Sequence, residues 1–345
     1  MNILLTSIGR RPYLIRWFRE ALSANNLSGR AIAADLDPYS PAQAFATDFV
    51  IAPRVDDPAY RDWLANVLQE YSIDLAVSIN DFELSEWALL PHTQEWAPLL
   101  RLTPETQRLV EDKFEMGEAL AAGGVCTPAT WLGSEVTGGV STEKSGGTGS
   151  KFITKGRYGS ASRGLHFATA DSLSNAIEIA TLEVTTRQGI AALEQKDVAP
   201  ESLVIVQERI EGIEYGVDVV CDLEGNFAAA LARRKIAMRA GETDRAETVA
   251  PDAFTEVAKK VAAVVPHPGV IDIDVLVDGD GNQFVIDVNP RFGGGYPFSH
   301  LAGAHIPSAY VAWAAGLHVQ REWFESTPGT FGSKYVEAVK VDGAD

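Results

Sequence analysis

The chain has 345 residues, 46% of them apolar, and a formal net charge of −18, a size that allows two or three domains with buried cores. Its acidity disfavours polyphosphate backbones and anionic membranes as partners, so we expect neither nucleic-acid binding nor membrane binding. It shows no apolar run of the ~18 to 20 residues that span a bilayer, no signal-peptide pattern in MNILLTSIGRRP, and no metal or disulfide spacing of its two cysteines, which together predict a cytoplasmic protein.

Residues 1–110 alternate short aliphatic strands with helical segments, which predicts a parallel α/β sheet with crossover helices. Strands are expected at 3–8, 31–35 and 74–79, and helices at 12–23 and 60–71. The first strand runs into TSIGRRP, so the glycine fingerprint of dinucleotide-binding sheets is missing. Asn80, Asp81 and Glu83 follow the strand at 74–79, on the edge where such sheets bind ligands. A substrate contact and a solvated polar loop are equally compatible with them.

The rest of the chain has a different pattern. Residues 104–122 have the period of one amphipathic helix, with proline at its start and glycines at its end. Residues 133–150 are rich in Gly, Ser and Thr, which predicts a mobile insertion. The remainder predicts an α+β fold, with strands at 151–155, 165–168, 203–207, 213–222, 226–239 and 270–289, and helices at 171–194, 252–264 and 307–315.

A Gly/Ser-rich turn joins two of these strands, in KGRYGSASRG at residues 155–164. Gly159, Ser160, Ser162 and Gly164 would let backbone N–H groups approach an anion closely, and the lysine and arginines of the segment add positive charge. The segment lacks the Walker pattern. Both a phosphate-covering hairpin and an ordinary turn fit the sequence.

A second segment, VIVQERIEGIEYGVDVV at residues 204–220, runs from an apolar strand through a turn into another strand. Adenine requires one donor and one acceptor from an extended backbone, and ribose hydroxyls favour a carboxylate. The residues that could supply these groups are Gln207, Glu208, Arg209 and Ile210 for adenine and Glu214 for ribose. A solvated, charged hairpin is the alternative.

The last polar segment combines two strands and the turn DGDGNQ, which predicts a hairpin. Period-two alternation puts Asp272 with Asp274 on one face of the first strand, and Asp287 with Asn289 on one face of the second. Hard oxygen ligands of this kind suit Mg2+ or Mn2+ rather than zinc. Arg291 would point the same way and could neutralise a transferring phosphoryl group. An acidic hairpin facing solvent is the alternative.

Residues 232–249 are locally basic, which suits an anionic substrate. The cations are Arg233, Arg234, Lys235, Arg239 and Arg245. A charged edge strand with a mobile loop would explain the same residues. The histidines show no metal-binding spacing.

The order of these motifs resembles the ATP-grasp superfamily, and within it the ligases similar to the carbamoyl-phosphate synthase large subunit. The motifs are the lysine of EDKF, the lysine before GSASRG, QERIEGIEYGVD, DIDVLV and IDVNPR. The resemblance implies an ATP-grasp fold of three parts. They are an N-terminal Rossmann-like pre-ATP-grasp domain at 1–110, a central subdomain at 111–205, and a C-terminal subdomain with the metal site at 206–345.

The resemblance also implies roles for single residues. Lys113 and Lys155 would contact the nucleotide phosphates, and residues 159–164 would close over them. Around adenine and ribose would lie Gln207, Glu208, Ile210 and Glu214. The Mg2+ ligands would be Asp274, Asp287 and Asn289, and Arg291 would stabilise the transition state. With Arg233 of the basic segment added, the candidate catalytic residues are Arg291, Lys155 and Arg233. Two departures from the family pattern are Gly156, where proline is usual, and Asp287, where glutamate is commoner.

The function implied is that of a biosynthetic ATP-dependent carboxylate–amine ligase. Such an enzyme forms an acyl phosphate and ADP, and joins a small carboxylic acid, for which an amino acid is a candidate, to an amine. A homodimer is compatible with the sequence. Residues 292–303 would lie beside the acyl phosphate, where Tyr296 or His300 could meet the substrate. The alternatives are a phosphotransferase of the carbamoyl-phosphate type and a catalytically silent nucleotide-binding protein.

Overall fold

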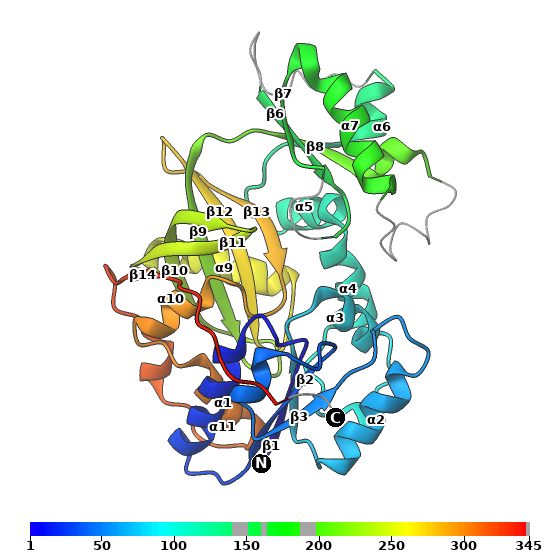
Figure 1. Ribbon diagram of the computed structural model, residues 1–345. Coiled ribbons are helices and arrows are strands. Elements are labelled where there is room, and N and C mark those ends of the chain that lie inside the picture. The colour runs from blue at the N-terminus through cyan, green and yellow to red at the C-terminus, as the bar shows by residue number, and fades with distance from the viewer. Residues whose placement is uncertain (140–150, 160–163, 187–197, 343–345) are drawn as a thin grey trace.

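The computed structural model describes residues 1–139, 151–159, 164–186 and 198–342 (Figure 1). The chain forms three sheets in this described part: a four-stranded sheet at the N-terminus, a second four-stranded sheet in the middle of the chain, and a six-stranded sheet towards the C-terminus. The α/β class of the first part and the α+β class of the rest are therefore confirmed.

The N-terminal sheet is parallel, in the order β3-β2-β1-β4. Its strands are β1 (Asn2–Thr6), β2 (Arg30–Asp35), β3 (Asp48–Ile51) and β4 (Leu75–Ser78). Alternate apolar residues pack on opposite faces, because Ile3 joins the core under α1 (Pro12–Ala24) whereas Leu4 joins the core under α2 (Tyr60–Glu70). The predicted strands and helices are confirmed, and β3 was not predicted.

The middle sheet has the order β5-β8-β6-β7 and stands apart at the top of Figure 1. Its strands are β5 (Thr130–Leu132), β6 (Lys151–Gly156), β7 (His166–Thr169) and β8 (Val204–Glu208). Its small core gathers Trp131, Phe152 and Val206 under α7 (Leu173–Thr186). The prediction of a structureless insertion is wrong at its start, because Gly133–Thr137 forms α6. Residues 140–150, and the predicted helix beyond Thr186 up to residue 194, lie outside the described residues.

The C-terminal sheet has the order β13-β12-β9-β10-β11-β14. Its strands are β9 (Gly212–Cys221), β10 (Phe227–Arg239), β11 (Glu242–Val249), β12 (Val270–Asp278), β13 (Gln283–Asn289) and β14 (Phe331–Ser333). Apolar residues such as Val217 and Ile273 face α9 (Asp252–Val264). The residues between them, including Asp218 and Asp272, lie on the other face, which is polar.

One apolar core joins the N-terminal sheet to the C-terminal sheet. Helix α1 packs against α11 (Ile306–Ala314), and Phe18 of α1 meets Phe292 and Tyr310 edge-to-face, with ring centroids 6.2 and 6.0 Å apart (Figure 1). This shared core holds the two parts in a fixed relation. None of the helices in the described ranges combines the length and apolar character needed to cross a bilayer.

The structure corrects three predicted elements. The single helix expected at 104–122 is two helices, α4 (Pro104–Glu111) and α5 (Lys113–Ala122). The polar residues after β4 begin a helix, α3 (Asp81–Ala88), and the segment 292–303 contains α10 (Tyr296–Leu301). The first correction arises at Asp112, whose backbone is extended and whose carboxylate caps the N–H groups of Phe114 and Glu115.

Candidate functional site

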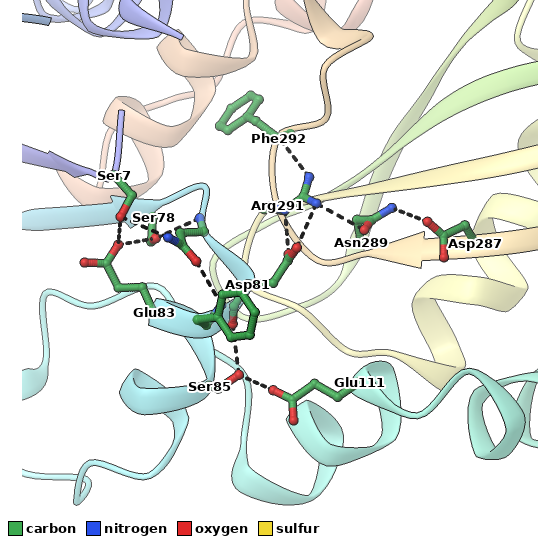
Figure 2. Close-up of polar contacts among 12 residues, drawn as sticks. Ser7, Ser78, Asp81, Glu83, Ser85, Glu111, Asp287, Asn289, Arg291 and Phe292 are labelled. Carbon is green, nitrogen blue, oxygen red and sulfur yellow. Dashed lines mark hydrogen bonds and ion pairs between the residues drawn. The ribbon is translucent and has the colours of Figure 1, made fainter. Parts of the chain in front are cut away.

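The β12–β13 hairpin brings the predicted acidic residues onto one face. Asp274 lies opposite Asp287 in the antiparallel register, and Asp272 lies opposite Asn289. The Asn289 side chain donates from Nδ2 to Asp287 Oδ2 at 3.1 Å, and Figure 2 shows these two residues side by side. The alternation expected from the sequence therefore gives one polar face on two neighbouring strands.

The two central carboxyls of this face differ in their surroundings. Burial raises the pKa of Asp274 to about 7, with Asp272 and Asp287 adding to the effect and Lys235 opposing it. Burial would also raise the pKa of Asp287, but Lys113 and Lys155 hold it below its ordinary value. Two cations thus stabilise the charged form of Asp287, whereas burial and neighbouring acids disfavour the charged form of Asp274.

These residues fit a divalent cation that shares substrate oxygens. In the described ranges, no group of three or more His, Cys, Asp and Glu side chains has the arrangement of a metal site. Asp274, Asp287 and Asn289 instead offer two carboxylates and one amide oxygen, and Mg2+ is commonly held by one or two carboxylates together with phosphate oxygens and water. Lys235 Nζ lies 2.5 Å from Asp274 Oδ1, and this contact would have to open for the oxygen to bind a metal.

Two lysines approach Asp287 from other parts of the fold. Lys155, on β6, donates to the backbone oxygen of Ile286 at 2.9 Å, and burial lowers its pKa to about 8. Lys113 is the first residue of α5, and its ammonium donates to the backbone oxygen of Gly159. Lys113, Lys155 and Asp287 thus come from three elements, α5, β6 and β13, and lie near one another.

A small pocket lies between α5 and β13. Its lining includes Lys113, Met116, Gln207, Ile286 and Asp287. It therefore connects the predicted phosphate-binding and metal-binding residues to the end of β8, where the adenine contacts were predicted. Gly159 and Gly164 both have positive φ, which favours glycine there, whereas Ser160 and Ser162 lie outside the described residues.

Within the described part of the chain, some backbone groups of the segment predicted to bind adenine are free for a ligand and others are already hydrogen-bonded. Glu208 donates its N–H to Ala129 O at 2.9 Å, so this residue can offer adenine only its carbonyl oxygen. Among the described residues, no hydrogen bond uses the N–H of Ile210. The Gln207 side chain is buried and donates to Thr130 at 2.9 Å. Glu214, the predicted ribose ligand, accepts from Lys235 at 2.6 Å.

The basic segment is largely neutralised. Arg233 is buried, with Nη1 2.6 Å from Asp218 and Nη2 2.6 Å from Asp272. Arg234 and Arg239 are also paired with acids. This segment therefore presents less free positive charge than its sequence suggests. Lys235 bridges Glu214 and Asp274, and its position two residues after Arg233 on one strand is the signal that would have assigned it to the same face.

The three glycines after Phe292 run across this charged face. An added Cβ would lie 2.0 Å from the Asp272 carboxyl at Gly293, and 2.0 Å from Arg233 Nε at Gly295. At these glycines the backbone therefore passes close to the protein's own charged side chains. Tyr296 is fully buried in the core, and His300, which is half-buried, stacks on Trp17 with ring centroids 3.7 Å apart.

Arg291 pairs with a residue of the N-terminal part. Its Nε lies 2.6 Å from Asp81 Oδ1 and its Nη2 lies 3.1 Å from Asp81 Oδ2 (Figure 2). Glu83 is buried and accepts from Tyr60 and Ser78. Of the polar residues that follow β4, Asp81 therefore reaches the candidate site, whereas Glu83 serves the interior of the N-terminal part.

Two segments of the chain match known protein families. Residues 3–96 match the family model described as the PylC-like N-terminal domain, and residues 201–336 match the model of the ATP-grasp in the biosynthetic pathway with Ter operon. The two models match separate parts of the chain, and the second is an ATP-grasp family model. No curated protein sequence matches it.

Solved structures share this ATP-grasp fold at low identity. Biotin carboxylase from Campylobacter jejuni, in a complex with β-γ-ATP, is 17% identical with a TM-score of 0.71, over 94% of this chain and 73% of that one. The biotin carboxylase domain dimer of 2-oxoglutarate carboxylase from Hydrogenobacter thermophilus, with MgADP and bicarbonate, is 16% identical with a TM-score of 0.71, over 94% and 72%. L-amino acid ligase from Bacillus licheniformis is 15% identical with a TM-score of 0.65, over 95% and 77%. These likenesses establish the fold.

Proposed function

We propose that this ATP-grasp protein is an ADP-forming ligase that joins a small carboxylic acid to an amine. The observation that carries the proposal is that Lys155 donates to Ile286, the neighbour of Asp287, and that Lys113 and Asp287 line one pocket, with Asp274 opposite Asp287. Two cations beside paired acids are what a triphosphate with its Mg2+ requires, because the cations neutralise phosphate oxygens and the acids hold the metal.

In this proposal, ATP occupies the space between the middle sheet and the C-terminal sheet. Adenine binds the backbone at Glu208 and Ile210, beside Gln207, and the ribose binds Glu214. The phosphates bind Lys113 and Lys155, beside Gly159. Support comes from the pocket that joins Lys113, Gln207 and Asp287, and from the unused N–H of Ile210.

Asp274, Asp287 and Asn289 would hold Mg2+, which would supply positive charge to neutralise the phosphates. Mn2+ would bind the same oxygen ligands. The part played by the protein itself is alignment. Arg291 and the two lysines surround the γ-phosphoryl group with fixed positive charge, and Arg233 fixes the floor of the site through Asp218 and Asp272.

The proposed reaction has two steps. A substrate carboxylate oxygen attacks the γ-phosphorus, the bond to the bridging oxygen breaks, and ADP leaves with that electron pair. The amine then attacks the acyl carbon, and inorganic phosphate leaves while the amine loses a proton. The likeness to an L-amino acid ligase supports amino acids as the first substrates to test.

The test is an ADP-release screen in which carboxylic acids are crossed with amines, with each component also omitted. A ligase releases ADP only when acid, amine and Mg2+ are all present. A phosphorylated product formed without the amine would assign a phosphotransferase instead. Tight MgATP binding, measured by calorimetry, with no turnover in any mixture would assign a silent nucleotide-binding protein.

A further inference from the structure

The ion pair between Asp81 and Arg291 joins two parts of the chain separated by 210 positions. Both carboxylate oxygens are used, one by Nε at 2.6 Å and the other by Nη2 at 3.1 Å. A carboxylate that takes one whole edge of a guanidinium fixes the plane of the guanidinium as well as its position. Asp81 therefore sets the direction in which the other edge of the Arg291 guanidinium faces.

The donors of Arg291 are unequally engaged. Nη2 also donates to Asn289 Oδ1 at 3.2 Å, so that the edge with Nε and Nη2 is fully occupied. Among the described residues, Nη1 has a single long contact, 3.5 Å to the backbone oxygen of Phe292. The donor left for an incoming anion is therefore Nη1. Arg291 follows the end of the strand that carries Asn289 and Asp287, as Figure 2 shows.

Asp81 is itself held rigidly. It is the first residue of α3, which Asn80 caps by accepting the N–H of Phe82 at 2.9 Å. Ser85 donates to the backbone oxygen of Asp81 at 2.9 Å. Glu83, two residues along, is fixed in the interior by hydrogen bonds from Tyr60, Thr6 and Ser78. This helix is therefore a firm support for the carboxylate.

Arg291 is supported from the other side. Its side chain is 12% exposed, and the next residue, Phe292, is part of the core that α1 and α11 share. Burial opposes the charge of Arg291, but Asp81 raises the pKa of the guanidinium above its ordinary value. The pair is thus held between two parts of the fold that pack against each other.

We propose that Asp81 is a positioning residue, which holds Arg291 so that Nη1 faces the transferring phosphoryl group. The inference rests on the proposed function, and it gives the N-terminal part a direct share in the chemistry. Asp81 acts through Arg291 and need not touch the substrate itself. A misplaced guanidinium would stabilise the transition state less, while ATP would still bind through the lysines.

The test compares Asp81→Asn with Glu86→Gln in the full-length protein. Glu86 lies on the same helix and pairs with Arg61 at 3.0 Å within the N-terminal part, which makes it a matched control. We expect Asp81→Asn to lower kcat by about 10- to 100-fold with little change in the KM for ATP, and Glu86→Gln to leave both unchanged. Asp81→Glu, which keeps the charge, should restore part of the loss.

A second readout does not depend on turnover. The Nε–H signal of Arg291 in NMR spectra of the nucleotide-free protein, assigned by its loss in Arg291→Lys, should exchange slowly with solvent in the wild type and rapidly in Asp81→Asn. In the Arg291→Lys background, Asp81→Asn should cause no further loss of kcat.

Three results would overturn the inference. They are an unchanged Nε–H exchange rate in Asp81→Asn, an equal loss of kcat in the Arg291→Lys background, and a kcat of Asp81→Asn equal to or above that of the wild type. A raised kcat would mean that Asp81 competes with substrate for Arg291. If the wild type releases no ADP with any acid and amine, the proposed function fails, and the exchange rate alone decides whether Asp81 positions Arg291.

Discussion

Asp112 and Arg157 form an ion pair, with Arg157 Nη2 2.6 Å from Asp112 Oδ2, that links the segments of Lys113 and Lys155, the two lysines proposed to bind phosphate. Asp112 directly precedes Lys113, and Arg157 follows Lys155 by two residues. The backbone adds a second connection, because Lys113 N–H donates to Arg157 O at 3.0 Å. The interruption between α4 and α5 is therefore what turns Lys113 towards the site.

Replacing Asp112 should weaken both the fold and the nucleotide site. Asp112→Ala removes the cap of α5 and leaves Arg157, which is 13% exposed, without its main partner. We expect the free energy of unfolding to fall by about 2 to 4 kcal/mol and MgATP affinity to fall about 10-fold. Denaturant unfolding and calorimetric titration measure the two effects.

The control is Glu105→Ala. It removes an exposed ion pair between Glu105 and Arg108, which both lie on α4, the helix before α5. This change should alter the unfolding free energy by less than about 1 kcal/mol. If Asp112→Ala binds MgATP as tightly as Glu105→Ala does, Asp112 has no part in placing Lys113.

The glycine run makes a steric prediction. In Gly295→Ala the new Cβ would lie 2.0 Å from Arg233 Nε, so the buried Arg233 network must shift. We expect a loss of about 1 to 3 kcal/mol in unfolding free energy. Gly279→Ala on the β12–β13 turn meets nothing within 4 Å and should change stability by less than about 0.5 kcal/mol. Equal denaturation midpoints for the two variants would show that the backbone does not pass close to Arg233.

The features that the sequence predicted best are those that follow from the short period of a strand or a helix. Alternation along two strands placed Asp272 and Asp274 on one face, and Asp287 with Asn289 on one face, because a strand has period two whatever surrounds it. The register adds that Asp274 is opposite Asp287. The same reasoning failed at residues 104–122, where the helical period continues through Asp112 while the backbone does not.

The contact between Asp81 and Arg291 could not be predicted, because no local pattern relates residues 210 positions apart. The start of α3 did have a local signal. Asn80 followed three residues later by Glu83 is a helix N-terminus pattern, and Asn80 is indeed the cap. The burial of Glu83 depends on Tyr60 and Thr6, which only the folded sheet brings close.

His267 makes the stability of the protein depend on pH. It is 4% exposed, and burial lowers its pKa from 6.5 to about 3. The unfolded chain therefore binds a proton at this histidine between about pH 6.5 and 3, and the folded protein does not, so its contribution to stability is present above pH 6.5 and is lost as the pH falls.

This histidine alone should lower the unfolding free energy by about 1.4 kcal/mol per pH unit in that range. Urea unfolding of the wild type and of His267→Leu between pH 6 and 4.5 measures the difference in slope. His318→Gln, at an exposed position, should keep the wild-type slope. Identical slopes in all three proteins would mean that His267 is protonated in the folded state.

The central claim is that Asp287 helps to hold the metal of an ATP-dependent ligase. Its most direct measurement is Mg2+-dependent ADP release by Asp287→Ala, beside the wild type and beside Asp280→Ala on the exposed turn of the same hairpin. We predict a loss on the order of 100-fold or more in Asp287→Ala and full activity in Asp280→Ala. Full Mg2+-dependent activity in Asp287→Ala would contradict the account.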